Sequence, residues 1–439
     1  MRFDAGARSF DIFQGSSMLN RTLASVGSTL CRIVLASVGF ACTPAIAQVP
    51  SLSLSQALSR AAASDAVLPA ARARIAGARA GINQAGRRPN PVAGVDVENF
   101  SGSGNYRGTR GAETTAYLQQ LIELGGKREA RIGVATSELS ATKARGAARV
   151  LDVLRDVEMA WIAAASATAT LDLAKQRLAA AQSLQEEVAR RAQAARDPAY
   201  VKTRAEAQVT LERISVEQAE SALEIALANL AAYWRGKPQF AINLAEFEKI
   251  TTMTAGSRYE AEKAIAEAER ALANARVELE RARAVPDPAV RLGVRRFSDT
   301  NDTAVVAGLS IPIPVFDQNR DAIAKAQAER RAAELDVETV QRALRREIGR
   351  LRGRLKADAE EARRVQNEAI PQAERAVALI RDGLVQGAFT YVEFNDAQRL
   401  LNDARARRIE ALRAYHSDVA AIARLTGLRS NFVGVKGMR

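Results

Sequence analysis

The chain has 439 residues, of which 26% are charged and only 5% are aromatic, and its formal net charge is +13. Ala, Arg, Glu, Gln and Leu lose little side-chain entropy in a helix, so their abundance favours long helices over a thick globular core. A basic charge of this size often indicates nucleic acid binding. Here the arginines are spread along every predicted helix, which is typical of solvated faces and inter-helix pairing and argues against nucleic acid as a partner.

The first 47 residues have the pattern of a signal peptide. Arg21 and Arg32 precede the apolar stretch IVLASVGFACTPAIA, which ends in Ala45-Ile46-Ala47, with a small residue on either side of Ile46. We therefore predict a signal peptide over residues 1–47, cleavage before Gln48 and export of the chain. Met18 is an alternative start. Two other interpretations stay open: the apolar run anchors the protein in a membrane, or Cys42 carries a lipid as the N-terminus.

Both cysteines, Cys31 and Cys42, lie inside this segment, so the exported chain would have no thiol for a disulfide or a metal site. His416 is the only histidine. A catalytic histidine needs a positioned nucleophile or acid, whereas Ser417 and Asp418 are merely its neighbours in sequence on a predicted helix, so we interpret His416 as structural. Transition metals are normally held by Cys or by several His. We therefore predict no metal site, no cofactor and no catalytic residue.

The sequence contains two similar halves, which indicates a duplicated domain. Pro89-Asn90-Pro91 recurs as Pro286-Asp287-Pro288, and LIELGGKREA (121–130) aligns with IPVFDQNRDA (313–322). Each half has about 190 residues, far more than one solenoid repeat.

Both halves have the same predicted order: a helix, two strands, a very long helix and a shorter helix. The first repeat is predicted over 48–245, with a helix over 52–86, strands within 90–124 and helices over 128–195 and 199–234. The second is predicted over 246–439, with a helix over 257–284, strands within 288–316 and helices over 320–385 and 391–426. Pro-x-Pro ends the first helix of each half because proline does not continue a helix. At 1.5 Å per residue, a helix of roughly 67 residues spans about 100 Å, which predicts a tube or a rod.

The second pair of strands alternates between apolar and polar or small residues. In TAVVAGLSIPIPVF (303–316), one face carries Val305, Leu309, Ile311, Ile313 and Val315. Such segments are typical of a membrane-spanning β-barrel. A half-buried soluble sheet has the same period and stays an alternative, and TAYLQQLIEL in the first half alternates poorly.

Four strands do not close a barrel, and an open sheet in lipid leaves its edge amides unpaired. Insertion as a barrel therefore requires an oligomer. Three chains would supply 12 strands, and their helices would continue as one tube.

The duplicated order of elements, with QLIELGGKR (120–128) and SIPIPVFDQNR (310–320) at the two strand-to-helix junctions, resembles the TolC-type outer membrane efflux proteins. The stretch from PDPAVRLGV to GLSIPIPVFDQNR is most similar to the CzcC-like heavy-metal efflux branch, and GAFTYVEFNDAQR (387–399) is a third matching motif. The resemblance implies a mixed α/β membrane protein with internal duplication. Its homotrimer would form a 12-stranded barrel, with four strands per chain, that continues into a long α-helical coiled-coil tunnel in the periplasm.

The same resemblance implies a place in the outer membrane of a Gram-negative cell, in contact with lipid. It also implies two protein partners: a periplasmic adaptor (membrane fusion) protein and an inner-membrane, proton-driven pump of the resistance-nodulation-division class. We expect a passive exit duct for heavy-metal cations and no enzyme activity. Two alternatives stay open: an exported helical coiled-coil protein that only binds partners, and the same duct exporting drugs or polypeptides.

Three groups of residues are candidate sites in this plan. The barrel–tunnel junction is expected at Gly125, Gly126, Pro312, Pro314 and Asp317, where Asp317 or Asn319 would cap the following helix. The helix breaks at the far end are expected to contact the adaptor through Asp197, Pro198, Gly387 and Phe389. Arg381 and Asp382, one turn before the second break, are hypothetical gate residues.

Overall fold

The computed structural model describes residues 51–63, 68–194, 198–251 and 260–432. The predicted signal peptide (1–47), with Cys31 and Cys42, and the tip residue Asp197 lie outside these ranges. The helices are α1 (Leu54–Ala63), α2 (Leu68–Ala85), α3 (Lys127–Gln193), α4 (Ala199–Ala232), α5 (Leu244–Phe247), α6 (Ala261–Arg283), α7 (Arg320–Arg364), α8 (Ile370–Gln386) and α9 (Tyr391–Thr426). The strands are β1 (Ser51–Leu52), β2 (Val92–Glu98), β3 (Glu113–Leu121), β4 (Ala241–Ile242), β5 (Ala289–Phe297) and β6 (Thr303–Ser310).

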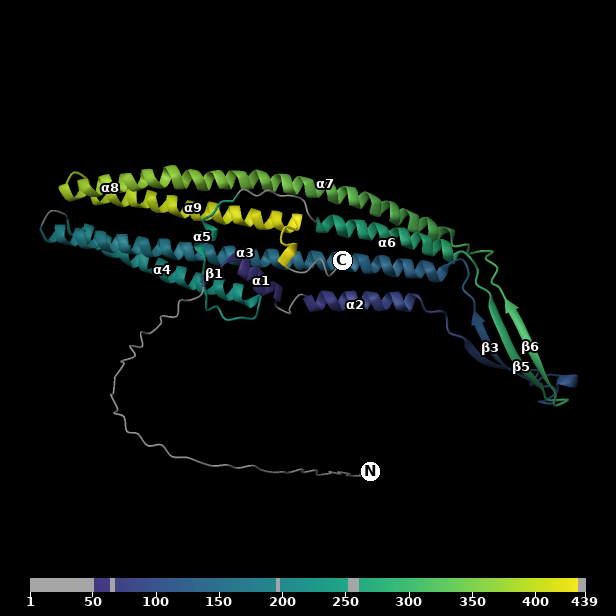
Figure 1. The fold of residues 1–439 in the computed structure, drawn as a ribbon. Helices are drawn as coiled ribbons and strands as arrows, with labels where there is room; N and C mark the ends of the chain where they lie inside the picture. The colour runs from purple at the N-terminus through teal and green to yellow at the C-terminus, as the bar shows by residue number, and fades with distance from the viewer. Residues whose placement is uncertain (1–50, 64–67, 195–197, 252–259, 433–439) are drawn as a thin grey trace, which may run out of the picture. The chain divides into compact units, whose positions relative to one another are not determined.

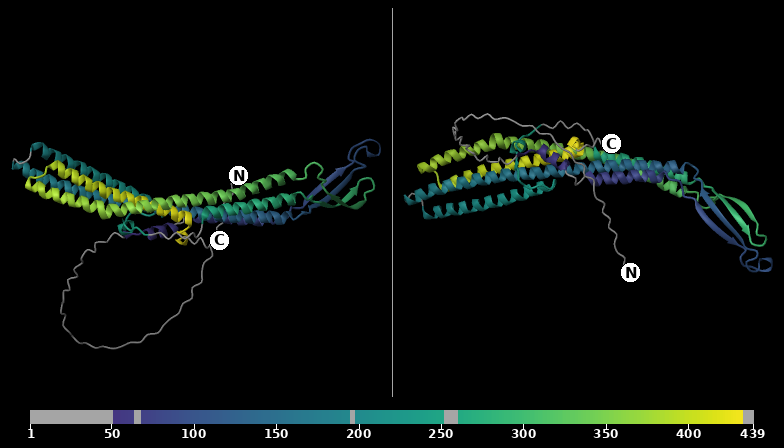
Figure 2. Two further views of the ribbon diagram at one scale, coloured as in Figure 1. Left: turned by 90° about the horizontal axis from the view of Figure 1, so that it is seen from above. Right: turned by 60° about the horizontal axis from the view of Figure 1, so that its bottom comes forward.

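The longest helix, α3, has 67 residues and contains no proline, so nothing in its sequence interrupts the ladder of backbone hydrogen bonds. It packs against α2, α4, α6 and α9, while α7 packs against α6 and α9. Within residues 51–432 the helices run side by side, and the larger sheet lies beyond the ends of α3, α6 and α7 (Figures 1 and 2). No helix in the described ranges has a stretch long and apolar enough to cross a lipid bilayer.

The main hydrophobic core lies at mid-length of α3. Trp161 is 1% exposed, and its indole Nε1 donates a hydrogen bond to Leu52 O at 3.2 Å. Leu52 belongs to β1, which pairs in parallel with β4, and Leu58 of α1 and Phe247 of α5 join the same core. Sequence analysis missed this small sheet because two-residue strands show no periodicity.

The four longer strands form one antiparallel sheet in the order β2-β3-β5-β6. β3 from the first half pairs with β5 from the second, with Ala116 opposite Val294. The two sequence repeats therefore share a single sheet, and β2 and β6 are its edges.

Three predicted ranges require correction. The helix predicted over 52–86 is two helices, α1 and α2. The helix predicted over 320–385 changes at 365–369 to π-helical spacing, where Ile370 N donates to Val365 O. Pro371 follows directly; it has no N–H, and its ring would clash with the carbonyl four residues earlier, so a local widening of the helix accommodates it.

The second strand predicted within 288–316 also ends earlier, at Ser310. Pro312 and Pro314 carry no N–H for a ladder. Beyond Ser310 the chain instead makes a tight turn around Pro314, in which Val315 N donates to Ile313 O at 2.9 Å.

Candidate functional site

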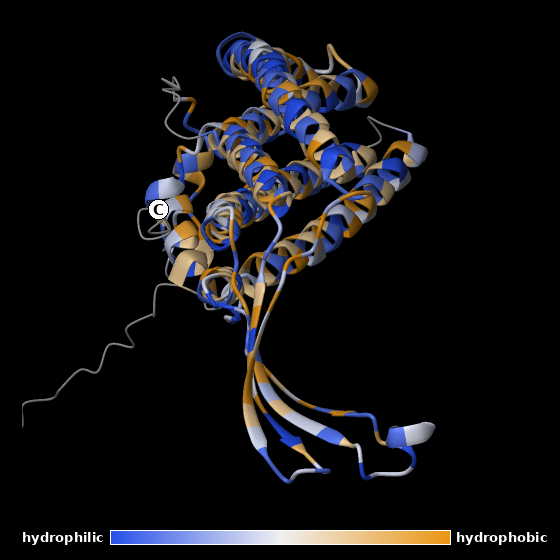
Figure 3. Cartoon of the chain, turned by 90° about the vertical axis from the view of Figure 1, so that its right-hand side faces the viewer, coloured by the Kyte–Doolittle hydropathy of each residue, from blue (hydrophilic) through white to orange (hydrophobic). Residues whose placement is uncertain are grey.

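The sheet has one apolar face that the chain leaves exposed. The register places Val95, Ala116, Val294 and Val305 in one row across the four strands. The next row is Ala93, Leu118, Leu292 and Ala307. Val305 is 75% exposed and Val95 is 65% exposed. Hydrophobic and hydrophilic residues are both visible along the sheet in Figure 3, as expected for a sheet whose two faces differ.

The opposite face of the sheet is polar and is held together by ion pairs. Arg295 of β5 reaches Glu98 on β2 and Glu113 on β3, each at 2.7 Å, and its Nε donates to Thr115 Oγ1 at 2.9 Å. Arg291, also on β5, pairs with Asp96 on β2. The two arginines therefore connect β5 to β2 across the intervening strand.

Tyr117 lies on this polar face between two glycines. A Cβ at Gly94 would lie 2.5 Å from the end of the Tyr117 ring, and one at Gly293 would lie 2.8 Å from Tyr117 Cβ. The Arg291 guanidinium stands 3.5 Å from the ring centroid, an arrangement that favours the cation electrostatically. Sequence analysis did not single out this cluster. The sequence did contain one indication of it: each strand next to Tyr117 has a glycine, Gly94 or Gly293, at a position that faces the polar side.

Two glycines form the turn at the first strand-to-helix junction. Gly125 (φ 67°) and Gly126 (φ 72°) both adopt the left-handed conformation that other residues avoid. A Cβ at Gly125 would also collide with Val285, 2.6 Å away. Asp287 completes the turn: its Oδ1 accepts from Leu124 N at 2.8 Å and pairs with Lys127 at 2.6 Å. The junction of the first half is thus held by the Pro-Asp-Pro segment of the second half.

Arg131 fastens the same junction to the end of α2, where its Nε donates to Ala85 O at 3.3 Å. Arg131 pairs with Glu123 through both carboxylate oxygens, and its Nη2 also donates to Arg87 O at 3.1 Å. The Arg131 guanidinium lowers the pKa of Glu123, mainly through the hydrogen bond it donates. Glu123 lies beyond the end of β3, so this contact orients the first turns of α3.

The second junction exposes apolar side chains. Ile313 is 80% exposed and Phe316 is 100% exposed, on either side of Pro314. Pro312 and Pro314 line a hollow of 640 Å³ next to Lys127 and Val285. The structure therefore brings the two predicted junctions together at the same level of the molecule.

The predicted cap of α7 is wrong in its mechanism. Asn319 occupies the N-cap position with φ 58°, but its side chain accepts no bond from the helix. It donates instead to Glu280 O at 2.6 Å, which ties α7 to α6. Asp317 Oδ1 accepts from Asn319 N at 2.9 Å and so shapes the turn that precedes the helix.

At the opposite end from the sheet, the end of α3 and the start of α4 lie beside the end of α8 and the start of α9 (Figure 1). Pro198 is the exposed N-cap residue of α4. Gly387 ends α8 with φ 83°, and the Phe389 ring covers Gly383, where a Cβ would lie 2.3 Å from it. Val188, Val201, Ala205 and Tyr391 form an apolar cluster that joins the two turns.

Arg381 and Asp382 are exposed on α8, close to this end. Neither side chain has a hydrogen-bond or ion-pair partner within the described ranges. The structure therefore places them where a neighbouring molecule has access to them.

Comparison with known proteins identifies the family. The model of the outer membrane efflux protein family matches residues 57–235 and 264–428. The chain belongs to this family. It is 30% identical over 390 residues to the cobalt-zinc-cadmium resistance protein CzcC of Cupriavidus metallidurans, which covers 86% of this chain and 90% of that protein. It is also 30% identical over 299 residues to the nickel-cobalt-cadmium resistance protein NccC of Alcaligenes xylosoxydans xylosoxydans, covering 67% and 68%.

Solved structures show the same fold. The outer membrane protein VceC of Vibrio cholerae aligns with a TM-score of 0.70 at 20% identity, over 85% of this chain and 96% of that chain. CusC aligns with a TM-score of 0.69 at 16% identity, over 85% and 91%. The predicted resemblance to TolC-type proteins of the CzcC-like branch is confirmed.

The family fixes the location and the general role. This outer membrane efflux protein resides in the outer membrane, with its helical portion in the periplasm. Its relatives are efflux channels and not enzymes, and the family provides the outer membrane component of multiprotein efflux systems.

His416 of this efflux protein packs inside the helical portion. Its Nε2 donates to Phe247 O at 2.7 Å, and its ring lies 5.3 Å from that of Phe247 and 5.0 Å from that of Tyr415. Burial lowers the pKa of His416. These contacts account for the histidine as a structural residue.

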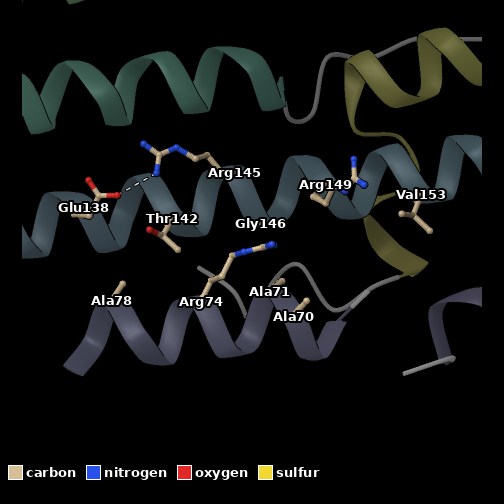
Figure 4. A pocket seen from close by; sticks show the side chains of 10 residues that line it. All are labelled: Ala70, Ala71, Arg74, Ala78, Glu138, Thr142, Arg145, Gly146, Arg149 and Val153. Atoms are coloured by element: carbon tan, nitrogen blue, oxygen red, sulfur yellow. Dashed lines mark hydrogen bonds and ion pairs between the residues drawn. The ribbon is translucent and has the colours of Figure 1, made fainter. Parts of the chain in front are cut away.

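A groove of 740 Å³ separates α2 from α3 (Figure 4). Its sides carry Arg74 from α2 and Arg149 from α3, and Arg145 pairs with Glu138 at 3.0 Å and with Glu269 of α6. Within the described ranges, no group of three or more His, Cys, Asp or Glu is placed to hold a metal ion. Small side chains line much of the groove, and three arginines give it a basic rim.

Proposed function

We propose that three copies of this chain form one passive exit duct for heavy-metal cations. The observation that carries the proposal is the sheet, which exposes an apolar face and has unpaired edges at β2 and β6. Unpaired edge amides are costly in lipid. β2 and β6 run in opposite directions in the four-stranded meander, so β6 of one chain is suited to antiparallel pairing with β2 of the next. Three chains then close a barrel of 12 strands.

The two ends of the helical portion would have different roles in this duct. Gly125, Gly126, Pro312 and Pro314, together with Asp317, would mark the change from barrel to coiled-coil tunnel. The tips at Asp197, Pro198, Gly387 and Phe389 would contact the periplasmic adaptor, since α4 begins and α8 ends at the end opposite the sheet (Figure 1). Energy would come from the inner-membrane resistance-nodulation-division pump, and the chain itself would have no enzyme activity and need no cofactor.

Arg381 and Asp382 would form charged constrictions where three copies of α8 approach the axis. Replacing Asp382 with Ala should change single-channel conductance, because it removes one charge per chain from the narrowest part. Unchanged conductance would remove Asp382 from the gate.

The cargo is inferred from the relatives. Both CzcC and NccC are named as resistance proteins for divalent metals, cobalt and cadmium among them. A deletion strain should become sensitive to one or more of zinc, cobalt, cadmium and nickel, and the cloned gene should restore growth. Sensitivity to drugs alone would reassign the cargo. A soluble monomer, in place of a heat-modifiable trimer in the outer membrane fraction, would overturn the duct itself.

A further inference from the structure

We infer that the polar face of the sheet determines which sign of charge passes through the duct. The determining groups are a row of carboxylates, Asp96, Glu98 and Glu113, and the two arginines that partly neutralise it, Arg291 and Arg295. This inference rests on the proposed trimeric barrel, in which the apolar face meets lipid and the polar face lines the water-filled interior.

The register decides which charges share this face. Alternate positions of β2, β3 and β5 place all three carboxylates on the side opposite Val95 and Val294. The arginine side chains lie on the same side, since both pair with these carboxylates. On the strands, three acidic groups face two basic ones, so each chain contributes one uncompensated negative charge and a trimer would contribute three.

The ion pairs also decide how those charges act on a passing ion. Arg295 engages Glu98 and Glu113 at 2.7 Å, and Arg291 engages Asp96. A carboxylate that already binds a guanidinium has fewer free oxygen lone pairs to coordinate a divalent metal. The row would therefore attract cations through its residual charge without holding them, so that a hydrated metal ion passes and is released.

A purely structural role for the same pairs makes a different prediction. The arginines connect β2 to β5 over β3, so losing either an arginine or its carboxylates would loosen the sheet in a similar way. Under the selectivity role, by contrast, removing positive charge and removing negative charge shift ion preference in opposite directions.

The test is the reversal potential of single trimers in planar bilayers under a KCl gradient. Arg295→Gln should raise the ratio of K⁺ to Cl⁻ permeability by at least about two-fold at 0.1 M KCl, where the Debye length is about 10 Å. The double variant E98Q/E113Q removes two negative charges per chain and should lower the ratio by a larger factor. Both shifts should shrink at 1 M KCl, where the Debye length is about 3 Å.

Two control variants accompany the test. Arg296→Gln removes the same charge one position along β5, on the apolar face, and should leave the ratio unchanged. Arg295→Lys keeps the charge and should restore the wild-type ratio. Heat-modifiable trimers on gels would establish that each variant assembles, and R291Q, which removes the other positive charge on this face, would replace R295Q if the latter does not assemble.

The possible outcomes separate the two proposals. If the wild-type protein forms no channel, the trimeric duct is wrong. If it forms channels and the charge variants leave the permeability ratio unchanged, or shift it in the same direction, the inference about the polar face is overturned and the duct stands.

Discussion

His416 shows how one residue can report on the whole helical portion. Its ring is packed between Phe247 and Tyr415, and this burial favours the neutral form by more than the hydrogen bond to the Phe247 carbonyl favours the charged one. Burial lowers its pKa below the ordinary value of 6.5. Below that pH the unfolded chain binds more protons than the folded one, so stability falls as the pH falls.

We predict that His416 causes part of this loss of stability at low pH and that replacing it reduces the loss. His416→Gln removes the titrating group and keeps a donor for Phe247 O. The loss of melting temperature between pH 7.5 and 5.5, followed by circular dichroism, should be smaller in the variant than in the wild-type protein. Because His416 is the only histidine, equal losses in the two proteins would contradict the prediction directly.

A second residue-scale prediction concerns Gly94. A methyl group there would lie 2.5 Å from the Tyr117 ring, so Gly94→Ala should destabilise the sheet by about 1–3 kcal/mol through overpacking. Gly308→Ala is the matched control, since its nearest contact is Arg291 Cβ at 3.8 Å. The readout is the temperature at which the trimer dissociates on gels. A G94A/Y117A variant should not show the additional loss that the clash causes, and additive losses would count against the packing explanation.

At the scale of the element, α9 has the best-defined helix start in the described chain. Thr390 and Glu393 form a capping box: Thr390 Oγ1 accepts from Glu393 N, and Thr390 N donates to Glu393 Oε2 at 2.7 Å. Hydrogen bonds from the Thr390 backbone and side chain lower the pKa of Glu393. The cap fixes α9 directly after the turn that contains Phe389.

We predict that Thr390→Ala weakens this end of α9 by about 1 kcal/mol, because it leaves a terminal N–H without its acceptor. Hydrogen exchange of the first two turns of α9 should quicken, while the middle of α9 stays protected. Thr390→Ser keeps the hydroxyl and serves as the control. Equal protection in Thr390→Ala and wild type would show that packing by Tyr391 alone holds the helix start.

The limits of sequence analysis are clearest for single elements. The length of α3 follows from residues that favour helix and from the absence of proline. The π-helical segment before Pro371 and the end of β6 at Ser310 depend on which backbone groups find partners after folding. Asn319 was a reasonable cap by residue type, yet its amide is drawn to Glu280 on a neighbouring helix.

At the scale of the whole molecule, the two halves are locked together at the junctions. Asp287, in the second half, accepts a hydrogen bond from Leu124 N and pairs with the Lys127 ammonium, both in the first half. The Lys127 side chain is 12% exposed and the Asp287 side chain is 16% exposed. If either charge is lost, water therefore cannot fully hydrate the charge that remains.

We predict that Asp287→Ala lowers stability by about 1–3 kcal/mol, because it leaves Leu124 N–H without its acceptor and removes the carboxylate that pairs with the poorly hydrated Lys127 ammonium. The dissociation temperature of the trimer should fall. Asp299→Ala, in the exposed turn between β5 and β6, should leave that temperature unchanged. If the two variants behave alike, the coupling between halves lies elsewhere.

The sequence by itself determined the parts of this protein that depend on local composition and period. These are the long helices, the duplicated order of elements, the alternation in β5 and β6, and the motifs that placed the chain among outer membrane efflux proteins. Only the tertiary structure decided what meets across the two halves. Arg295 and Glu98 are 197 residues apart in sequence, and neither their types nor their spacing reveals the register that joins them. Strand register and helix contacts are set by packing between distant segments, and so the charges that would line the duct became visible only in the folded sheet.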